Sequence, residues 1–152
     1  MMRRNAAGFS AIEMIMVIVV VGIMMAVAIP FLRNSSAKTS VRGAADTISR
    51  LYATARAASI QRGKTAWLVL NHSASTVLVI ASKVSATGVD TIVKPENLNT
   101  LYSVTFTNTN DSLVFTPRGI GANLVTTQVV LSSTSGGIVD TVLIYPTGKI
   151  KR

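Results

Sequence analysis

The sequence Gly8-Phe9-Ser10-Ala11-Ile12-Glu13 opens an apolar run that continues to Leu32 and decides the N-terminal half of the fold. Glu13 is the only ionisable side chain in this run, because the nineteen positions from Met14 to Leu32 carry no charge. A helix of that length crosses a hydrocarbon core of about 30 Å. A charged side chain at the bilayer centre costs about 2.5–3.5 kcal/mol on insertion scales. We therefore expect Glu13 to have a function and a cationic partner at the same depth.

The charges that flank the run predict its orientation. Arg3 and Arg4 precede it, which places the N-terminus in the cytoplasm and the rest of the chain across the membrane. Arg33 and Lys38 follow the run, but two charges after a long span do not overturn this bias. A secretory signal peptide is the alternative, and it fits poorly because the run is long and lacks a small-residue cleavage site before a polar start. We expect a single-pass anchor.

The motif Gly8-Phe9-Ser10-x-Ile12-Glu13, followed by an unbroken apolar segment, resembles the class III signal of type IV pilins and type II secretion pseudopilins. The resemblance implies that prepilin peptidase cleaves after Gly8 and methylates Phe9, the new N-terminal residue. Residues 1–8 would then be a leader peptide and residues 9–32 the transmembrane helix. Gly22 and Pro30 fall where this family has a helix-softening glycine and a helix-kinking proline.

Cleavage before Phe9 would create an ammonium group four residues from Glu13. In a staggered stack of helices, the amine of one subunit meets Glu13 of its neighbour, and each charge then becomes tolerable in lipid. A head-to-tail contact that does not close on itself generates a helical filament. Glu13 is therefore predicted to act in filament assembly. The alternative is an acid that snorkels to the membrane edge without a partner.

The resemblance also implies a location and a set of partners. The protein is expected in the bacterial inner membrane with its C-terminal domain in the periplasm, and afterwards in a pilus or pseudopilus. Expected partners are other major and minor pilins or pseudopilins, prepilin peptidase and the inner-membrane assembly platform.

Residues 33–63 are predicted to form an amphipathic soluble helix. Its apolar positions recur at helical spacing, Arg50 and Arg56 are among the cations on the opposite side, and Gly63 is expected to end it. The many alanines favour close packing against a sheet. Asn34-Ser35-Ser36 is a candidate for a looser junction with the membrane helix, although in pilin-like proteins the two are usually one long helix. The stretch from Ala55 to Gly63 resembles the GspH/FimT group of minor pseudopilins and pilins. The predicted stripe comprises Val41, Ala44, Ala45, Ile48, Leu51, Tyr52, Ala55, Ala58 and Ser59.

Residues 64–152 are predicted to form a β-rich globular domain. Short strand-like segments alternate with turns rich in Ser, Thr, Asn and Gly, and no βαβ alternation occurs. The fold class is therefore expected to be α+β with mainly antiparallel pairing. Residues 84–89 and 95–101 read as surface loops. The predicted strands are Thr65–Leu70, Thr76–Ala81, Thr91–Val93, Tyr102–Thr107, Leu113–Phe115, Gln128–Leu131 and Thr141–Tyr145.

Catalytic and metal-binding patterns are missing from the sequence. The chain has no cysteine, its only histidine is His72 in a predicted hairpin turn, and its acids after the anchor are scattered singly. The glycine-rich loop from Gly119 to Gly121 lacks the following helix that a phosphate cradle needs. We expect no catalytic residues, no metal and no cofactor, and a structural protein rather than an enzyme.

Charge suggests a second function class. The net charge is +9, and the chain after the anchor contains thirteen basic but only five acidic residues. The C-terminal Gly148-Lys149-Ile150-Lys151-Arg152 resembles a Gly-Arg-x-Arg pattern of DNA-binding FimT-like minor pilins, with lysines in place of both arginines. Double-stranded DNA is therefore an alternative partner, with Lys149, Lys151, Arg152 and Arg118 as candidate contacts. A solvated basic face, or acidic neighbouring subunits, would explain the same charge.

Overall fold

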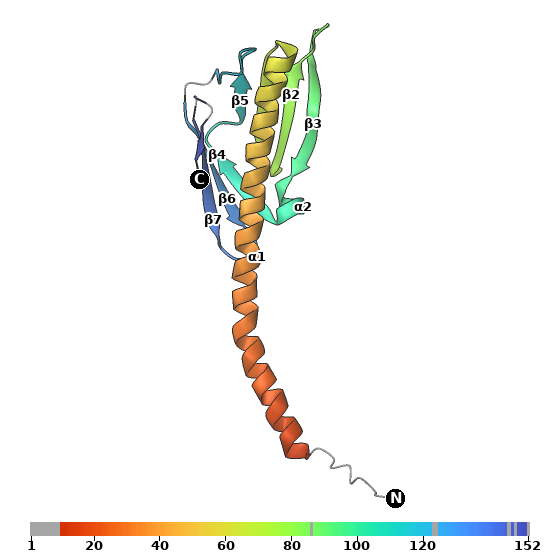
Figure 1. Ribbon diagram of the computed structural model, residues 1–152, viewed down its shortest axis with the longest axis vertical. Helices are drawn as coiled ribbons and strands as arrows, with labels where there is room; N and C mark the ends of the chain where they lie inside the picture. The colour runs from red at the N-terminus through yellow and green to blue at the C-terminus, as the bar shows by residue number, and fades with distance from the viewer. Residues whose placement is uncertain (1–9, 86, 123–124, 146, 148, 152) are drawn as a thin grey trace, which may run out of the picture.

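A computed structural model describes residues 10–85, 87–122, 125–145, 147 and 149–151. A single long helix, α1 (Ala11–Arg62), projects from a β-rich domain that covers its C-terminal half (Figure 1). The Asn34-Ser35-Ser36 segment does not interrupt it, and Pro30 lies within it. The single long helix that pilin-like proteins usually have is therefore confirmed. The helix curves in its N-terminal half, where no other element packs against it (Figure 1).

Backbone geometry at both ends of α1 matches the sequence signals. Ser10 is extended at the N-cap position, and Gly63 adopts the left-handed conformation with φ of 58°. The N–H groups of Gly63 and Lys64 donate to the carbonyl oxygens of Ile60 and Ser59, which satisfies acceptors that the helix end leaves free. Gly63 thus ends the helix as predicted.

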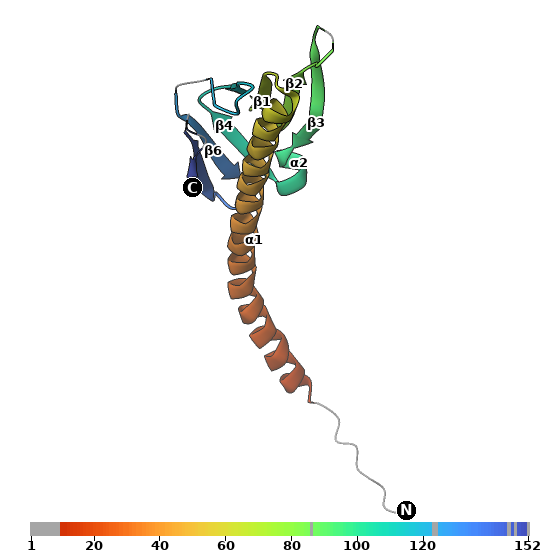
Figure 2. The same ribbon diagram turned by 45° about the horizontal axis from the view of Figure 1, so that its top comes forward.

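Two four-stranded sheets, with all pairs antiparallel, flank the C-terminal half of α1. Figure 2 shows them fanning out to either side of the helix. The predicted α+β class is confirmed. The first sheet has the order β3-β2-β1-β5, with β1 (Ala66–Asn71), β2 (Thr76–Ser82), β3 (Val89–Asn97) and β5 (Ser112–Phe115). The second has the order β4-β6-β7-β8, with β4 (Val104–Asn108), β6 (Thr127–Ser133), β7 (Val139–Ile144) and β8 (Ile150–Lys151).

The predicted apolar stripe of α1 is the side that packs on both sheets. All nine of its predicted residues are buried, and Ala44, Ile48 and Leu51 are completely inaccessible. Small alanine side chains let the sheets approach the helix closely, and the larger side chains fill the space between the sheets. The sheets contribute Leu68, Leu70, Val77, Val79, Phe106, Leu113, Phe115, Val129, Leu131, Val142 and Ile144 to the same core.

The segment predicted as a surface loop, residues 95–101, is instead structured. It contains the end of β3 and a one-turn helix, α2 (Leu98–Tyr102), whose Leu98 is fully buried. The Asn97 side chain accepts a 2.9 Å hydrogen bond from the Thr100 N–H and caps this helix. The prediction failed because a single helical turn is too short to show a periodic pattern.

Two ion pairs connect β3 to α1. Arg50 donates to both carboxylate oxygens of Glu96 at 2.9 and 2.8 Å, and Arg62 donates to Asp90 at 2.9 Å. All four groups remain partly exposed, so each pair stabilises the fold by at most about 1 kcal/mol. Their main effect is to fix the position of the long edge strand along the helix.

Candidate functional site

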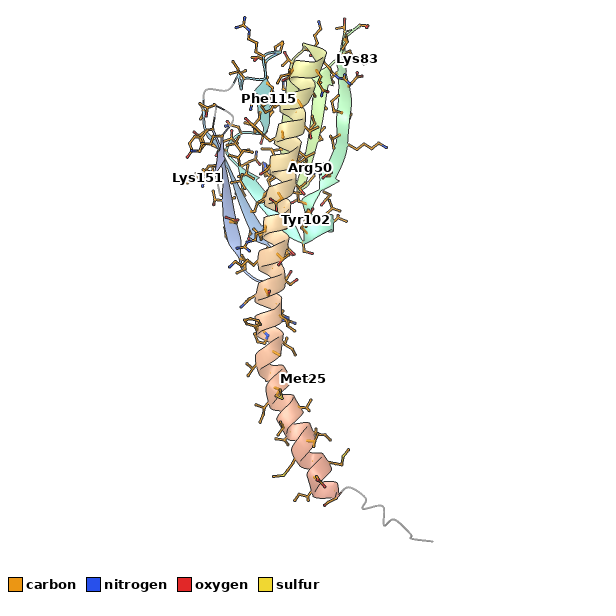
Figure 3. The ribbon with its side chains drawn as sticks, viewed as in Figure 1. Met25, Arg50, Lys83, Tyr102, Phe115 and Lys151 are labelled. Carbon is orange, nitrogen blue, oxygen red and sulfur yellow. The ribbon has the colours of Figure 1, made fainter. Side chains whose placement is uncertain are left out.

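The N-terminal half of α1 is the largest exposed apolar surface in the described part of the chain. Every residue from Ser10 to Ser36 is exposed. Ile12 keeps 69% of its surface accessible and Phe31 keeps 74%. Figure 3 shows side chains around Met25 projecting from a helix with no neighbouring element. Among the described residues, α1 is also the one helix long and apolar enough to span a membrane. Such a surface requires lipid or partner helices to cover it.

Glu13 lies in the first turn of α1, at the free end of this surface. Its N–H donates to the Ser10 carbonyl oxygen at 3.1 Å, and its side chain is exposed. A carboxylate in the first turn is favoured by the positive end of the helix dipole. Gly8 and Phe9, the predicted cleavage and methylation residues, lie outside the described residues.

The predicted helix-softening residues lie in the same half of α1. A side chain on Gly22 would meet no atom of this chain within 4 Å, so intramolecular packing does not require glycine there. Pro30 lacks a backbone N–H and removes one helical hydrogen bond, which is a recognised cause of bending. Whether these two residues soften and kink the helix stays a prediction.

A second surface is an open groove between the C-terminal part of α1 and strand β8, which we call the α1–β8 groove. Its volume is about 400 Å³. The groove was not predicted from the sequence, because it depends on the position of a two-residue strand. Its lining residues are Ser49, Tyr52, Ala53, Arg56, Ala57, Ile60 and Ile150.

Lys149 and Lys151, two of the predicted DNA contacts, flank the groove residue Ile150. Both lysines are exposed, whereas Ile150 is half-buried. Strand β8 pairs with Leu143 and Ile144 of β7, and the Tyr145 N–H donates to the Lys149 carbonyl oxygen at 2.9 Å. Ile150 pairs with the buried Ile144 and shares its face of the sheet toward α1, whereas Lys151 pairs with Leu143 and lies on the other face. Arg152 lies outside the described residues.

Arg118, the third described candidate, reaches the same stretch of α1 from a different segment. It lies in the turn after β5, where Gly119 is buried against Ile60. A Cβ on Gly119 would lie 2.6 Å from Ile60 Cδ1 and 3.5 Å from Arg56 Cγ. Arg118 is exposed beside this contact. The fold therefore brings Arg118 close to Arg56, a residue that the sequence placed only on the solvent side of the helix.

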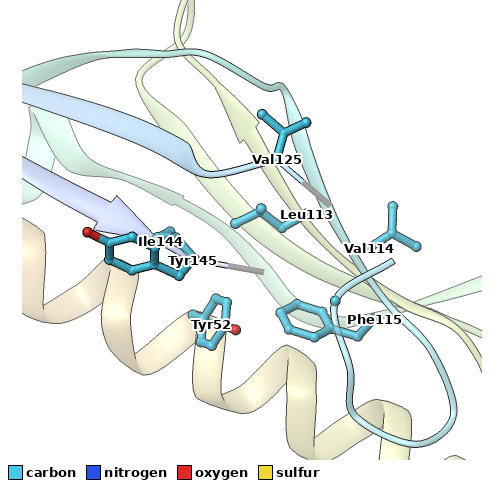
Figure 4. A pocket seen from close by; sticks show the side chains of 8 residues that line it. Tyr52, Leu113, Val114, Phe115, Val125, Ile144 and Tyr145 are labelled. Atoms are coloured by element: carbon cyan, nitrogen blue, oxygen red, sulfur yellow. The ribbon is translucent and has the colours of Figure 1, made fainter. Parts of the chain in front are cut away.

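Tyr52 lines the α1–β8 groove and contacts the core, and burial and a neighbouring charge shift its pKa in opposite directions. Burial raises the pKa of the Tyr52 phenol above its usual value of 10.0, and the Arg56 guanidinium lowers this pKa by a smaller amount. The Tyr52 and Phe115 rings meet edge to face with centroids 5.0 Å apart (Figure 4). Tyr52 is 5% exposed, so it offers little ring surface to a ligand.

The cavity beside Tyr52 and Phe115 and the surroundings of His72 offer little room or chemistry for a ligand. The cavity in Figure 4 has a volume of about 10 Å³, near the minimum for one water molecule. His72 Nδ1 lies 3.8 Å from Asp111 Oδ1, and both side chains are exposed. Within the described ranges, no three His, Cys, Asp or Glu side chains gather as a metal site would require.

The sequence model of the family described as type II transport protein GspH matches residues 44–148, which is more than half of the chain. The chain belongs to the GspH family. The predicted resemblance to GspH-type minor pseudopilins is therefore confirmed. No curated protein sequence matches this GspH family member significantly.

Solved structures share its fold. The type IV minor pilin FimU of Pseudomonas aeruginosa PAO1 matches with a TM-score of 0.56 and 15% identity, covering 75% of this chain and 88% of FimU. The minor pseudopilin EpsH from the type 2 secretion system of Vibrio cholerae matches with a TM-score of 0.50 and 10% identity, covering 76% of this chain and 94% of EpsH. At these identities the likeness establishes a pilin-like fold for this GspH family member.

Proposed function

We propose that this protein is a minor pilin or pseudopilin that enters the inner membrane through the N-terminal half of α1 and then joins or primes a filament. Prepilin peptidase cleaves between Gly8 and Phe9 and methylates Phe9. The filament is a type IV pilus or a type II secretion pseudopilus. The assembly platform and other pilin-like subunits are its partners.

The observation that supports this proposal is the complete exposure of the apolar half of α1, from Ser10 to Ser36. Lipid covers this surface before assembly, and the helices of neighbouring subunits cover it afterwards. Glu13, at the free end, then pairs with the Phe9 ammonium of a neighbour. An unpaired charge there is destabilised by several kcal/mol, so pairing favours the staggered contact.

Replacing Glu13 with alanine tests the assembly role. We expect Glu13→Ala to reach the membrane in normal amounts but to enter filaments at least tenfold less, since the lost pairing is worth more than about 1.4 kcal/mol. Fractionation of sheared filaments and membranes measures both pools. Asp111→Asn is the matched control, because Asp111 is a highly exposed acid on the globular domain. Unchanged incorporation of Glu13→Ala would contradict the proposal.

Intact-mass measurement tests processing separately. The protein extracted from membranes of cells with active prepilin peptidase is expected to lack residues 1–8 and to carry one methyl group on Phe9. A mass that retains Met1 under these conditions would exclude the proposed processing.

The exposed cations Arg118, Lys149 and Lys151 support a second candidate function, binding of double-stranded DNA during DNA uptake. Such binding would be dominated by phosphate contacts and would weaken steeply with salt. The triple variant Arg118→Glu, Lys149→Glu, Lys151→Glu is expected to flatten the plot of log affinity against log salt by about 0.9 per lost contact. Gel shifts of duplex DNA with the full chain measure this slope. Lys83→Glu with Lys94→Glu is the control pair, and equal slopes for both variants would reject the DNA function.

A further inference from the structure

The α1–β8 groove combines an apolar floor with a basic rim. Ala53 and Ala57 lie one helical turn apart and are both exposed, and Ile60 keeps 52% of its surface accessible. Ile150 of β8 forms the opposite wall. Small side chains on the floor allow the backbone of a partner to approach closely. Burial of the isoleucine side chains would favour an apolar occupant, because it removes apolar surface from water.

The apolar surface continues from the groove onto the neighbouring turn. Gly119 packs on Ile60, and the next residue, Ile120, is 57% exposed. An exposed apolar surface rimmed by charged residues is typical of protein–protein interaction sites. The groove lies on the C-terminal part of α1, well separated from the apolar N-terminal half that the membrane covers.

The rim carries cations that find no acid in the described part of the chain. The rim cations are the groove-lining Arg56 and the neighbouring Arg118, and neither forms an ion pair with any described residue. Glu96 instead pairs with Arg50, and Asp90 pairs with Arg62. The complement of this surface is a segment that has both apolar side chains and carboxylates.

These features fit a protein segment better than a nucleic acid. A DNA backbone would satisfy the cations but would leave Ala53, Ala57 and Ile150 facing polar phosphates and sugars. Single-stranded bases would need an exposed aromatic side chain for stacking, and the only aromatic residue in the groove, Tyr52, is almost fully buried.

We propose that the α1–β8 groove docks an apolar, carboxylate-bearing segment of a companion pilin-like subunit. This inference rests on the proposed assembly function and identifies the surface through which the globular domain contacts its neighbour. Apolar side chains of the segment lie over Ala53, Ala57 and Ile150, and its carboxylates pair with the rim cations.

Site-specific crosslinking tests the occupant directly. Because the chain has no cysteine, Ala57→Cys provides a unique site for a benzophenone maleimide on the full-length protein in its own membranes. Ala74→Cys, at an exposed alanine in the turn between β1 and β2, is the matched control. We expect only the Ala57→Cys product to contain a peptide from another pilin-like subunit, with Asp or Glu next to an apolar run. Products with DNA or lipid, a peptide without carboxylates, or equal yields at both sites would overturn the inference.

Two variants test the floor and the rim separately. Ala57→Trp fills the groove, and Arg56→Glu with Arg118→Glu reverses the rim charge. Each change is expected to lower incorporation into filaments about tenfold. Ala74→Trp and Lys83→Glu with Lys94→Glu are the controls and are expected to have no effect. Circular dichroism confirms that each variant is folded.

The Glu13→Ala variant distinguishes failure of this inference from failure of the proposed function. If Glu13→Ala blocks incorporation but both groove variants assemble normally, the groove inference is wrong and the assembly function stands. If Glu13→Ala also assembles normally, the proposed assembly function is rejected together with it.

Discussion

Gly43 of α1 lies directly against the ring of Tyr102 in α2. A Cβ at position 43 would lie 2.8 Å from Tyr102 Cε1, closer than carbon atoms normally approach. The Tyr102 hydroxyl lies 2.9 Å from Thr47 Oγ1, so a hydrogen bond holds the ring in place one turn further along the helix. The close approach therefore fixes α2, and with it the start of β4, on the surface of α1.

Gly43→Ala is expected to destabilise the globular domain by about 1–2 kcal/mol. Overpacking costs about 1–3 kcal/mol, and the better helix propensity of alanine offsets up to about 1 kcal/mol of it. Thermal unfolding of the full chain in detergent measures the change. Gly22→Ala is the control, because it alters helix propensity where no atom of the chain lies within 4 Å. A Gly43→Ala protein as stable as the wild type would show that the Tyr102 ring can move.

Gly119→Ala is expected to be more destabilising than Gly63→Ala. Both residues have positive φ, 73° and 58°, so alanine is strained at either position by about 1–2 kcal/mol. Only at Gly119 does the added Cβ also collide with Ile60, at 2.6 Å. Denaturant unfolding of the two variants compares these costs. Equal losses of stability would mean that Ile60 rotates away freely.

Leu98→Ala is expected to reduce the free energy of unfolding by about 2–5 kcal/mol, since Leu98 is fully buried. Leu101→Ala, in the same short helix but 58% exposed, is expected to change it by less than about 0.5 kcal/mol. The same denaturant titration measures both. Similar effects would contradict the finding that Leu98, and not Leu101, is the buried leucine of α2.

Tyr52 is expected to make stability fall at alkaline pH. Because burial raises its pKa above 10.0 in the folded state, the phenol loses its proton more readily in the unfolded chain. The stabilisation is complete below pH 10 and is lost as pH rises from 10 through the raised pKa. Tyr52→Phe should therefore lose less stability than the wild type between about pH 9 and pH 11. Parallel pH profiles from urea titrations would disprove this contribution.

The strongest predictions from sequence were those supported by long periodic patterns. The nine apolar positions between Val41 and Ser59 span five turns, and every one is buried. The hairpin predicted at Thr65–Leu70 and Thr76–Ala81 matches β1 and β2 to within one residue at each end. In these segments the alternating or helical spacing of apolar residues extends over enough positions to identify the element despite single exceptions.

Short elements, and sites formed by segments distant in the sequence, were harder to predict from the sequence. Strand β8 has two residues and α2 has five, so neither shows a period. Arg118 was named as a candidate DNA contact, but nothing in the sequence placed Arg56 beside it. That relationship exists only because Gly119 packs on Ile60. The roles of Gly8, Phe9 and Glu13 stay predictions from the motif.

The continuity of α1 makes the protein a rod that is rigidly joined to its domain. Its 52 residues give a length of about 78 Å at 1.5 Å per residue. Each residue turns the helix by about 100° about its axis. The number of residues between Glu13 and Arg56 therefore determines the angle about this axis between Glu13 and the basic rim. A single inserted residue in the exposed half would rotate the whole domain by that angle while leaving every contact within it intact.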